Sequence, residues 1–221
     1  MMLSKSTLEF LTALKKNNTR PWFEANRDWY QESKNDFEVL VVEIIKGLGN
    51  FDKDISELQV KNCTFRQYRD VRFSKDKRPY KINMGAYFNK GGKKINTAGY
   101  YIHLEPGKSM IAGGLWMPEP LPLSKVRQEI DYNFKDWQKI TASVAYKKLF
   151  TDGLSTEDKL QRPPKGYDVL NEAIEYLKLK SFISRRSLSD KDLTGPGLTN
   201  EITKSFKALK PMIDFLNRAI E

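Results

Sequence analysis

Residues 99–116 read GYYIHLEPGKSMIAGGLW, and this stretch decides the fold of the chain. In residues 99–105 apolar and more polar side chains alternate, which is the period of two that is typical of a strand with one buried face. The Pro-Gly pair at 106–107 is a turn signal, and residues 109–116 return to strand-forming types. The stretch therefore predicts a β-hairpin.

Further strands are predicted on both sides of this hairpin. Residues 85–88 (GAYF) form a short candidate, and the glycine pair at 91–92 ends it. Residues 180–187 form a later candidate, which we expect to return to the same sheet. A second glycine pair, at 113–114, indicates that a backbone, a side chain or a ligand approaches the strand closely at this point.

Apolar residues at three- and four-residue spacings predict helices in the rest of the chain. A capping box opens the first of them, with Ser6 at the N-cap and Glu9 three residues later. The predicted helices cover residues 6–16, 21–49, 123–150, 168–178 and 199–219.

Helices at both ends and strands in the middle predict one α+β domain over residues 1–221, with a central antiparallel sheet flanked by N-terminal and C-terminal helices. The only cysteine, Cys63, excludes an internal disulfide and fits a reducing compartment. There is no signal-peptide pattern and no apolar run long enough to cross a bilayer. We therefore expect a soluble cytoplasmic protein with no membrane partner.

The positive charge of the chain is concentrated in one segment. Residues 61–94 contain eleven Lys and Arg and two Asp, a net charge of +9, whereas the whole chain carries +10. Cations at this density repel one another, and a fold that gathers them usually offers them an anion. The segment is therefore the first place to look for a binding site.

The basic side chains of residues 66–81 are the candidate anion-binding residues, because guanidinium and ammonium groups suit phosphate and carboxylate. They are Arg66, Arg69, Arg72, Lys75, Lys77, Arg78 and Lys81, with Tyr68 and Tyr80 as supporting aromatic residues. The alternative is a solvated face, on which arginine stems cover aromatic side chains and two aspartates act as internal partners.

Asp70 and His103 are the candidate catalytic residues. Asp70 lies between Arg69 and Arg72, so it is either a base or metal ligand or the centre of an ion-pair cluster, and arginine neighbours make it a poor base. His103 is the only histidine and shares a strand face with Tyr101 and Glu105, and Glu105 could orient it as a base. A purely structural role stays open for both residues.

The sequence predicts no cofactor and no metal. One histidine and one cysteine nearly exclude a zinc site of the usual kind. The glycine-rich phosphate loop, the dinucleotide-binding glycine pattern and the nucleophile elbow of esterases are absent from the sequence. Mechanisms that depend on these motifs therefore have no support.

Several stretches carry a resemblance to a known family. They are RDVRFSKDKRPYK at 69–81, GGLWMP at 113–118, RPPKGY at 162–167, and the early pattern between Phe10 and Phe23. With these stretches the chain resembles a widespread family of uncharacterised bacterial and fungal proteins, catalogued as a domain of unknown function. The resemblance implies a self-contained domain of about this size. It implies no established activity, so no catalytic residue is carried over.

Three hypotheses for the function follow. The first, which the charge distribution favours, is a binding protein that holds phosphate, a nucleotide or a nucleic acid with residues 66–81. The second is an enzyme that acts on a phosphorylated or carboxylated small molecule, with Asp70 or His103 moving a proton. The third is a structural or interaction protein with an acidic partner. The ligand and the oligomeric state are open at this point.

Overall fold

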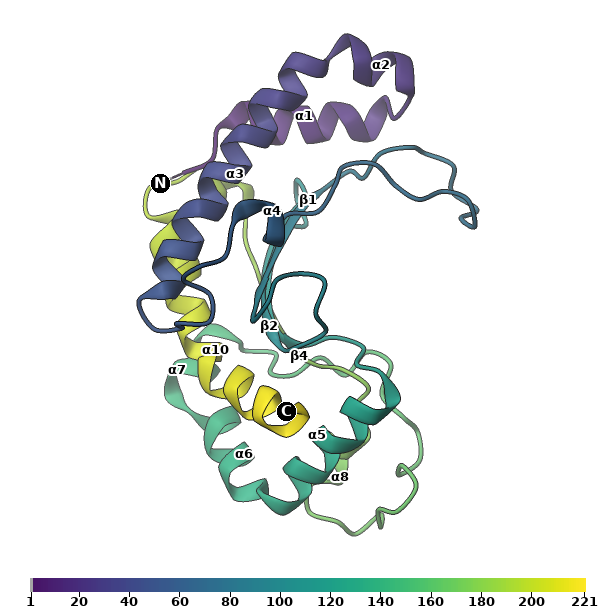
Figure 1. Cartoon of the computed structure of the whole chain (residues 1–221), viewed down its shortest axis with the longest axis vertical. Coiled ribbons are helices and arrows are strands. Elements are labelled where there is room, and N and C mark those ends of the chain that lie inside the picture. The colour runs from purple at the N-terminus through teal and green to yellow at the C-terminus, as the bar shows by residue number, and fades with distance from the viewer. Residues whose placement is uncertain (1) are drawn as a thin grey trace. The chain divides into compact units, whose positions relative to one another are not determined.

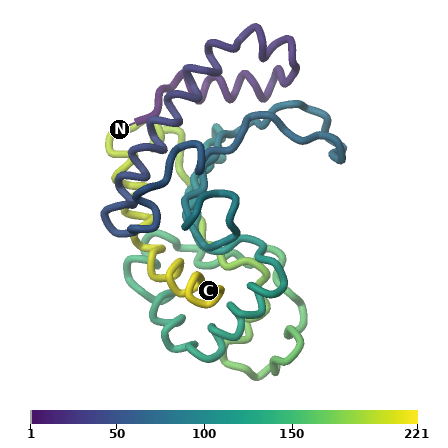
Figure 2. Tube along the Cα trace, in the orientation of Figure 1, coloured from purple at the N-terminus to yellow at the C-terminus, as the bar shows by residue number. Residues whose placement is uncertain are grey.

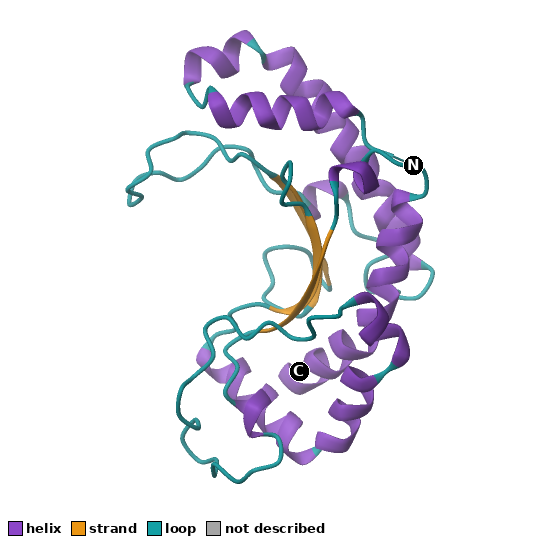
Figure 3. Ribbon diagram, turned by 180° about the vertical axis from the view of Figure 1, so that it is seen from behind, coloured by secondary structure: helices purple, strands orange, loops and turns teal. Residues whose placement is uncertain are grey.

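The computed structural model describes residues 2–221 and has the α+β fold that the sequence predicts. One antiparallel sheet, drawn in orange in Figure 3, has the strand order β1-β2-β3-β4, so each strand pairs with the next one along the chain. The strands are β1 (Met84–Asn89), β2 (Gly99–Leu104), β3 (Met110–Leu115) and β4 (Phe182–Ser187). The predicted hairpin and both additional strands are therefore confirmed.

Helices precede and follow the strands along the chain (Figure 1). They are α1 (Lys5–Lys16), α2 (Arg20–Ala25), α3 (Arg27–Gly49), α4 (Val60–Cys63), α5 (Pro120–Tyr132), α6 (Phe134–Ala142), α7 (Val144–Leu149), α8 (Ile174–Leu177), α9 (Asp190–Leu193) and α10 (Leu198–Ile220). Within residues 2–221, none of the helices combines the length and the apolar composition that crossing a bilayer requires.

The chain folds into two compact units, each built from separate stretches of sequence (Figure 2). The first unit comprises the residues up to Lys94, Tyr101–Ile111 and Ser187–Lys204. The second comprises Ile95–Tyr100, Ala112–Arg186 and Ser205–Glu221. The basic segment lies wholly within the first unit.

Aromatic side chains of α1, α2 and α3 form much of the core of the first unit. The Phe10 ring is fully buried, and its centroid lies 5.5 Å from Trp29, 5.9 Å from Tyr30 and 6.1 Å from Trp22. Rings at these separations pack closely and favour tilted or edge-on arrangements. Phe10 of α1 therefore packs against aromatic rings of both α2 and α3.

The first helix begins earlier than the sequence predicts. Its N-cap is Ser4 instead of Ser6, and the Ser4 hydroxyl accepts a hydrogen bond from the Ser6 N–H at 3.2 Å. Asp36 of α3 accepts hydrogen bonds from the Ser4 N–H at 2.9 Å and from the Thr7 hydroxyl at 2.6 Å. A tertiary contact with α3, which no local pattern reveals, thus favours a start at Ser4.

The core of the second unit surrounds Trp137 of α6, which is fully buried. The Trp137 ring centroid lies 5.1 Å from that of Phe215 and 6.2 Å from that of Phe182. Along α10, the Phe206 ring lies 5.1 Å from Tyr100 of β2. The apolar face of α10 within this unit therefore covers strand residues, as its periodicity predicts.

The predicted helix over residues 168–178 is largely wrong, since only α8 is helical there. The Asp168 carboxylate accepts a hydrogen bond from the Leu170 N–H at 2.7 Å, and the Asn171 side chain accepts one from the Ala173 N–H, also at 2.7 Å. Short polar side chains that bond the backbone two residues ahead stabilise turns in place of helix. These two turns delay the helix until Ile174.

Candidate functional site

The basic segment and its flanks fold into an antiparallel arm, which comprises residues 64–86 (Figure 1). Three backbone hydrogen bonds pair its two sides: Phe65 N–H to Gly85 O at 3.2 Å, Lys81 N–H to Gln67 O at 2.9 Å, and Arg69 N–H to Pro79 O at 2.9 Å. Residues 70–78 connect the two sides and form the apex of the arm. The turn of this loop lies at residues 71–74, where the Ser74 N–H donates a hydrogen bond to the Val71 carbonyl oxygen at 3.3 Å.

A bulge separates the base of the arm from its outer part. From the pair Phe65–Gly85 to the pair Gln67–Lys81, the chain runs through two residues on one side of the arm and through four on the other. The buried Gln67 side chain donates hydrogen bonds to the carbonyl oxygens of Lys81 and Asn83. It therefore satisfies carbonyl groups that the interrupted ladder leaves open, and a bulge of this kind redirects the side chains around it.

Tyr80 fixes the arm to the helices of the first unit. Its buried ring stacks on Phe23 with the centroids 3.9 Å apart and the planes 10° from parallel. The Asn18 side chain accepts a hydrogen bond from the Tyr80 N–H and donates one to the Tyr80 carbonyl oxygen, both at 3.0 Å. The Tyr68 ring lies 5.0 Å from Tyr80 and is half exposed. Tyr80, predicted as a supporting residue, thus packs in the core.

Three of the predicted anion-binding arginines are paired with carboxylates of the arm. Arg72 forms a two-bond pair with Asp70 at 2.9 and 2.7 Å. Arg78 pairs with Asp76 at 3.0 and 2.7 Å, and Arg69 contacts the same carboxylate at 2.8 Å. Hydrogen bonds from the Arg72 and Arg78 side chains lower the pKa values of Asp70 and Asp76, respectively. Both aspartates are therefore ionised partners of arginine.

Other contacts brace the apex from within. The Arg69 guanidinium donates to the Arg78 carbonyl oxygen at 3.0 Å, and the Lys77 ammonium donates to the Val71 carbonyl oxygen at 3.1 Å. Lys75 is exposed on the same loop. The cations of residues 69–78 therefore order the apex and do not gather around one pocket.

A second group of cations, which we call the Phe65 cluster, consists of Lys81 and Lys93 beside the Phe65 ring and Arg66, whose charge acts on Lys81. The ammonium nitrogens of Lys81 and Lys93 lie 5.3 and 5.9 Å from the centroid of the Phe65 ring. Burial, and then the charges of Arg66 and Lys93, lower the pKa of Lys81. Among residues 2–221, no carboxylate forms an ion pair with Lys81 or Arg66. Within the described part of the chain, the cluster therefore holds like charges together without an ion-pair partner, and the one carboxylate seen to interact with it is Asp70, whose pKa the charge of Arg66 lowers further.

Backbone carbonyls position the third cation of the cluster. The Lys93 ammonium donates hydrogen bonds to the carbonyl oxygens of Lys61, at 2.7 Å, and Thr64. Both carbonyl groups belong to the short stretch from α4 to the start of the arm. Lys93 thereby ties the loop after β1 to the base of the arm and contributes its charge next to Phe65.

A polar chain runs along one face of β2. The Tyr101 hydroxyl lies 3.1 Å and the Asn83 amide nitrogen 3.4 Å from His103 Nδ1, while His103 Nε2 lies 3.2 Å from Glu105 Oε2. The Asn83 amide nitrogen can only donate, so Nδ1 is an acceptor and Nε2 carries the proton that is donated to Glu105. The Tyr101 hydroxyl then donates to Nδ1. We call this chain the Tyr101 relay.

The Tyr101 relay meets the Phe65 cluster at the base of the arm. The rings of Tyr101 and Phe65 pack edge-on, with centroids 6.4 Å apart and planes at 67°. A Cβ atom at Gly85 would lie 2.7 Å from the Tyr101 hydroxyl oxygen, so glycine leaves room for the phenol over β1. A group of cations and a hydrogen-bonded chain of ionisable side chains are therefore adjacent.

The structure separates the two predicted catalytic candidates. Asp70 is exposed on the apex loop and is bound to Arg72, whereas His103 lies on β2 between Tyr101 and Glu105. His103 therefore reaches the Phe65 cluster through Tyr101, whereas Asp70 interacts with the cluster only through the charge of Arg66. Sequence reasoning missed the contacts of Lys93 and Asn83, whereas the strand period already placed Tyr101 on the same face as His103.

Other chemistry has little support in this part of the chain. Cys63 is buried, and burial raises the pKa of its thiol to about 11, so it is a poor nucleophile. Within residues 2–221, no group of three or more His, Cys, Asp or Glu side chains is placed to hold a metal ion.

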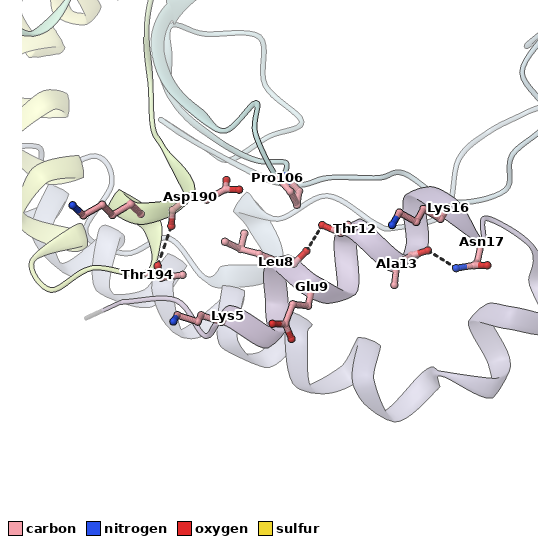
Figure 4. A pocket seen from close by; sticks show the side chains of 11 residues that line it. Lys5, Leu8, Glu9, Thr12, Ala13, Lys16, Asn17, Pro106, Asp190 and Thr194 are labelled. Carbon is pink, nitrogen blue, oxygen red and sulfur yellow. Dashed lines mark hydrogen bonds between the residues drawn. The ribbon is translucent and has the colours of Figure 1, made fainter.

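A shallow groove of about 710 Å³ lies elsewhere in the first unit, along one face of α1 (Figure 4). Its polar side chains bond to nearby backbone: Thr12 to Leu8 O, Asn17 to Ala13 O and Thr194 to Asp190 O. None of the predicted site residues lines it. Lys5, Lys16 and Lys191 line the groove together with Glu9 and Asp190, so its charges nearly balance, and it is a weaker candidate for an anion site than the Phe65 cluster.

Comparison with known proteins identifies a family and nothing closer. No curated protein and no solved structure matches the chain. The model of one family of conserved hypothetical proteins, DUF2461, matches residues 6–215 and so covers both units. The family resemblance expected from residues 69–81 and the other quoted stretches is therefore confirmed, and the chain belongs to the conserved hypothetical protein family DUF2461.

Proposed function

We propose that the protein binds a phosphate-bearing anion, such as a phosphate ester or a nucleotide, at the Phe65 cluster. The observation that carries the proposal is the convergence of the Lys81 and Lys93 ammonium groups on one ring, with the positive charge of Arg66 nearby. Holding like charges together costs free energy, and a bound anion would offset that cost.

The single cysteine further supports a reducing, cytoplasmic setting.

Phosphate fits this arrangement better than a single carboxylate does. Its three or four oxygens can accept hydrogen bonds from several donors at once, and Lys81 and Arg66 both have donors that are free of carboxylates. The half-exposed Phe65 ring offers an apolar surface for a ligand's sugar or base. The cluster therefore favours a phosphate group attached to an organic body.

The proposal predicts that Lys81→Met weakens the binding of small phosphates. Inorganic phosphate, pyrophosphate and nucleotides should raise the melting temperature of the wild-type chain, and calorimetry would give the Kd. The substitution should raise the Kd about 10-fold or more, since a hydrogen bond to a charged group contributes about 1.5–3 kcal/mol.

Lys148→Met is the matched control, because Lys148 is exposed on α7 in the second unit. It removes the same charge without touching the Phe65 cluster and should leave the Kd unchanged. An equal loss of affinity in Lys81→Met and Lys148→Met would mean that net charge alone attracts the ligand. If no anion shifts the melting temperature of the wild type, the proposal fails and the interaction-protein hypothesis gains.

A second candidate function, an enzyme acting on the bound phosphate ester, is favoured by the Tyr101 relay. Glu105 orients His103 so that Nδ1 is the basic nitrogen, and the Tyr101 hydroxyl is its partner. In such an enzyme, the anion is held by the Phe65 cluster while His103 takes up a proton through Tyr101. Asp70 is a poor candidate for that task because its pKa is lowered by Arg72.

The enzyme hypothesis predicts different effects for the two catalytic candidates. For any phosphate ester that stabilises the chain and is converted, His103→Asn should lower kcat by about 10²- to 10⁴-fold while the thermal shift persists. Asp70→Asn should retain turnover. A reversal of these two effects would give Asp70 the proton-transfer role, and a wild-type chain that turns over none of its ligands would argue against an enzyme.

A further inference from the structure

The apex of the arm presents an exposed aromatic ring. Phe73 is 95% exposed, which is unusual for a phenylalanine on a folded surface. The Arg72 guanidinium lies 5.7 Å from its ring centroid, on one side of the ring. A flat apolar face with a cation beside it is therefore open to solvent at the end of the arm.

Contacts within the loop that carries Phe73 stabilise its conformation. The Arg69 guanidinium spans the loop to Asp76, and Lys77 closes it to Val71. At the base of the arm, Asn18 and Phe23 fix Tyr80 to the helices. The backbone of the arm extends away from the helices α1, α2 and α3, as Figures 1 and 3 show. Because the loop at its apex is already ordered, less conformational entropy is lost when a partner binds.

The arm combines this ring with positive charge. Residues 66–81 contain seven Lys and Arg and two Asp, a net charge of +5. Phe65, whose ring is half exposed, lies at the base of the arm with Lys81 and Lys93 beside it. Rings paired with cations at the base and at the apex are the arrangement by which proteins bind single-stranded nucleic acid, since bases stack on the rings and phosphates meet the cations.

We propose that the arm binds single-stranded nucleic acid, with a base stacked on Phe73 and the backbone phosphates contacted by Arg72, Lys75 and Lys77. A single strand suits the apex because its bases are free to leave the stack, whereas a duplex hides their faces. The proposal extends the proposed anion binding to a polymer, and it rests on that binding only at the base of the arm, where Phe65 and Lys81 are shared.

An anionic membrane is the competing partner for a basic arm with an apical ring, and the observations favour it less. Phe73 is the only large apolar side chain of the apex loop that is mostly exposed, so few side chains could enter the acyl region. The carboxylates of Asp70 and Asp76 flank it at 44% and 38% exposure, respectively. Burying these charged groups in lipid would oppose insertion.

The test measures binding of a fluorescent oligothymidylate of about 12 nucleotides to the full chain by anisotropy. Phe73→Ala should weaken binding about 5- to 100-fold, the loss expected when one base loses its aromatic platform. Phe73→Leu should be equally weak, because it keeps the apolar volume but loses the flat ring, and Phe73→Trp should restore binding. Lys75→Met should reduce the slope of log K against log salt by about 0.7.

Leu170→Ala is the matched control, since Leu170 is 87% exposed in the second unit and should not affect binding. Binding of small phosphates should survive Phe73→Ala, which separates this inference from the proposed function. An oligonucleotide that binds no tighter than a mononucleotide, or equally well to the wild type and Phe73→Ala, would overturn the inference. The inference would also be overturned if the chain bound phosphatidylserine vesicles, if the Phe73→Leu variant kept that binding, and if the oligonucleotide did not displace the vesicles.

Discussion

Replacing Gly114 by alanine should destabilise the protein by about 4 kcal/mol or more, or prevent it from folding. A Cβ atom at this position would lie 1.9 Å from the Phe182 carbonyl oxygen and 2.9 Å from its carbon, and both are backbone atoms of β4. The φ angle of Gly114 is +127°, where an L side chain adds strain of about 1–3 kcal/mol. Strand β4 would have to move away from β3, which breaks ladder hydrogen bonds.

Two other glycines provide graded controls for Gly114→Ala, with urea unfolding followed by circular dichroism as the measurement. Gly107 has a φ of +74°, but a Cβ atom added there would meet no other atom within 4 Å, so Gly107→Ala should cost only the backbone strain, about 1–2 kcal/mol. At Gly113 the nearest atom is Leu209 Cδ1 at 2.7 Å, the end of a flexible side chain, and the loss should be intermediate. Equal losses at Gly107 and Gly114 would contradict the argument.

The glycine pair at 113–114 shows what a local sequence pattern can predict and what it cannot. Two adjacent glycines in a predicted strand indicated a close approach, and the structure places Leu209 of α10 against Gly113 and the β4 backbone against Gly114. The pattern could not identify these partners, because both lie far away in sequence. Period and turn signals thus sufficed for the hairpin and for the fold class, whereas the identity of long-range neighbours needed the structure.

The candidate site was predictable only in part, for a related reason. Charge density pointed to the segment that forms the arm, but it did not distinguish cations that pair with nearby aspartates from cations that have no carboxylate partner. The Asp70–Arg72 and Asp76–Arg78 pairs have the same spacing of two residues, which places each carboxylate beside the backbone N–H of its arginine as well. The Phe65 cluster depends on a bulge and on the loop after β1, and neither leaves a periodic signal.

Asn18→Ala should lower the free energy of unfolding by about 2–4 kcal/mol, since it leaves the N–H and the carbonyl group of buried Tyr80 without partners. Because Lys81 follows Tyr80, release of the arm should also weaken phosphate binding at the Phe65 cluster. Hydrogen–deuterium exchange should show faster exchange at the Lys81 and Arg69 amides, whose bonds pair the two sides of the arm.

Asn17→Ala removes the same side chain one residue earlier and serves as the control. The Asn17 amide is exposed and donates only to Ala13 O in its own helix, so we expect a loss of at most about 1 kcal/mol and unchanged exchange in the arm. Asn18→Asp keeps the oxygen that accepts from the Tyr80 N–H but places a second oxygen against the Tyr80 carbonyl, so the volume is conserved while one bond becomes repulsive. If Asn18→Asp and Asn18→Ala both behave like Asn17→Ala, the arm is held by the Tyr80–Phe23 stack alone. A large loss of unfolding free energy in both Asn18 variants would mean that the two hydrogen bonds of the Asn18 side chain determine the position of the arm and of its cations.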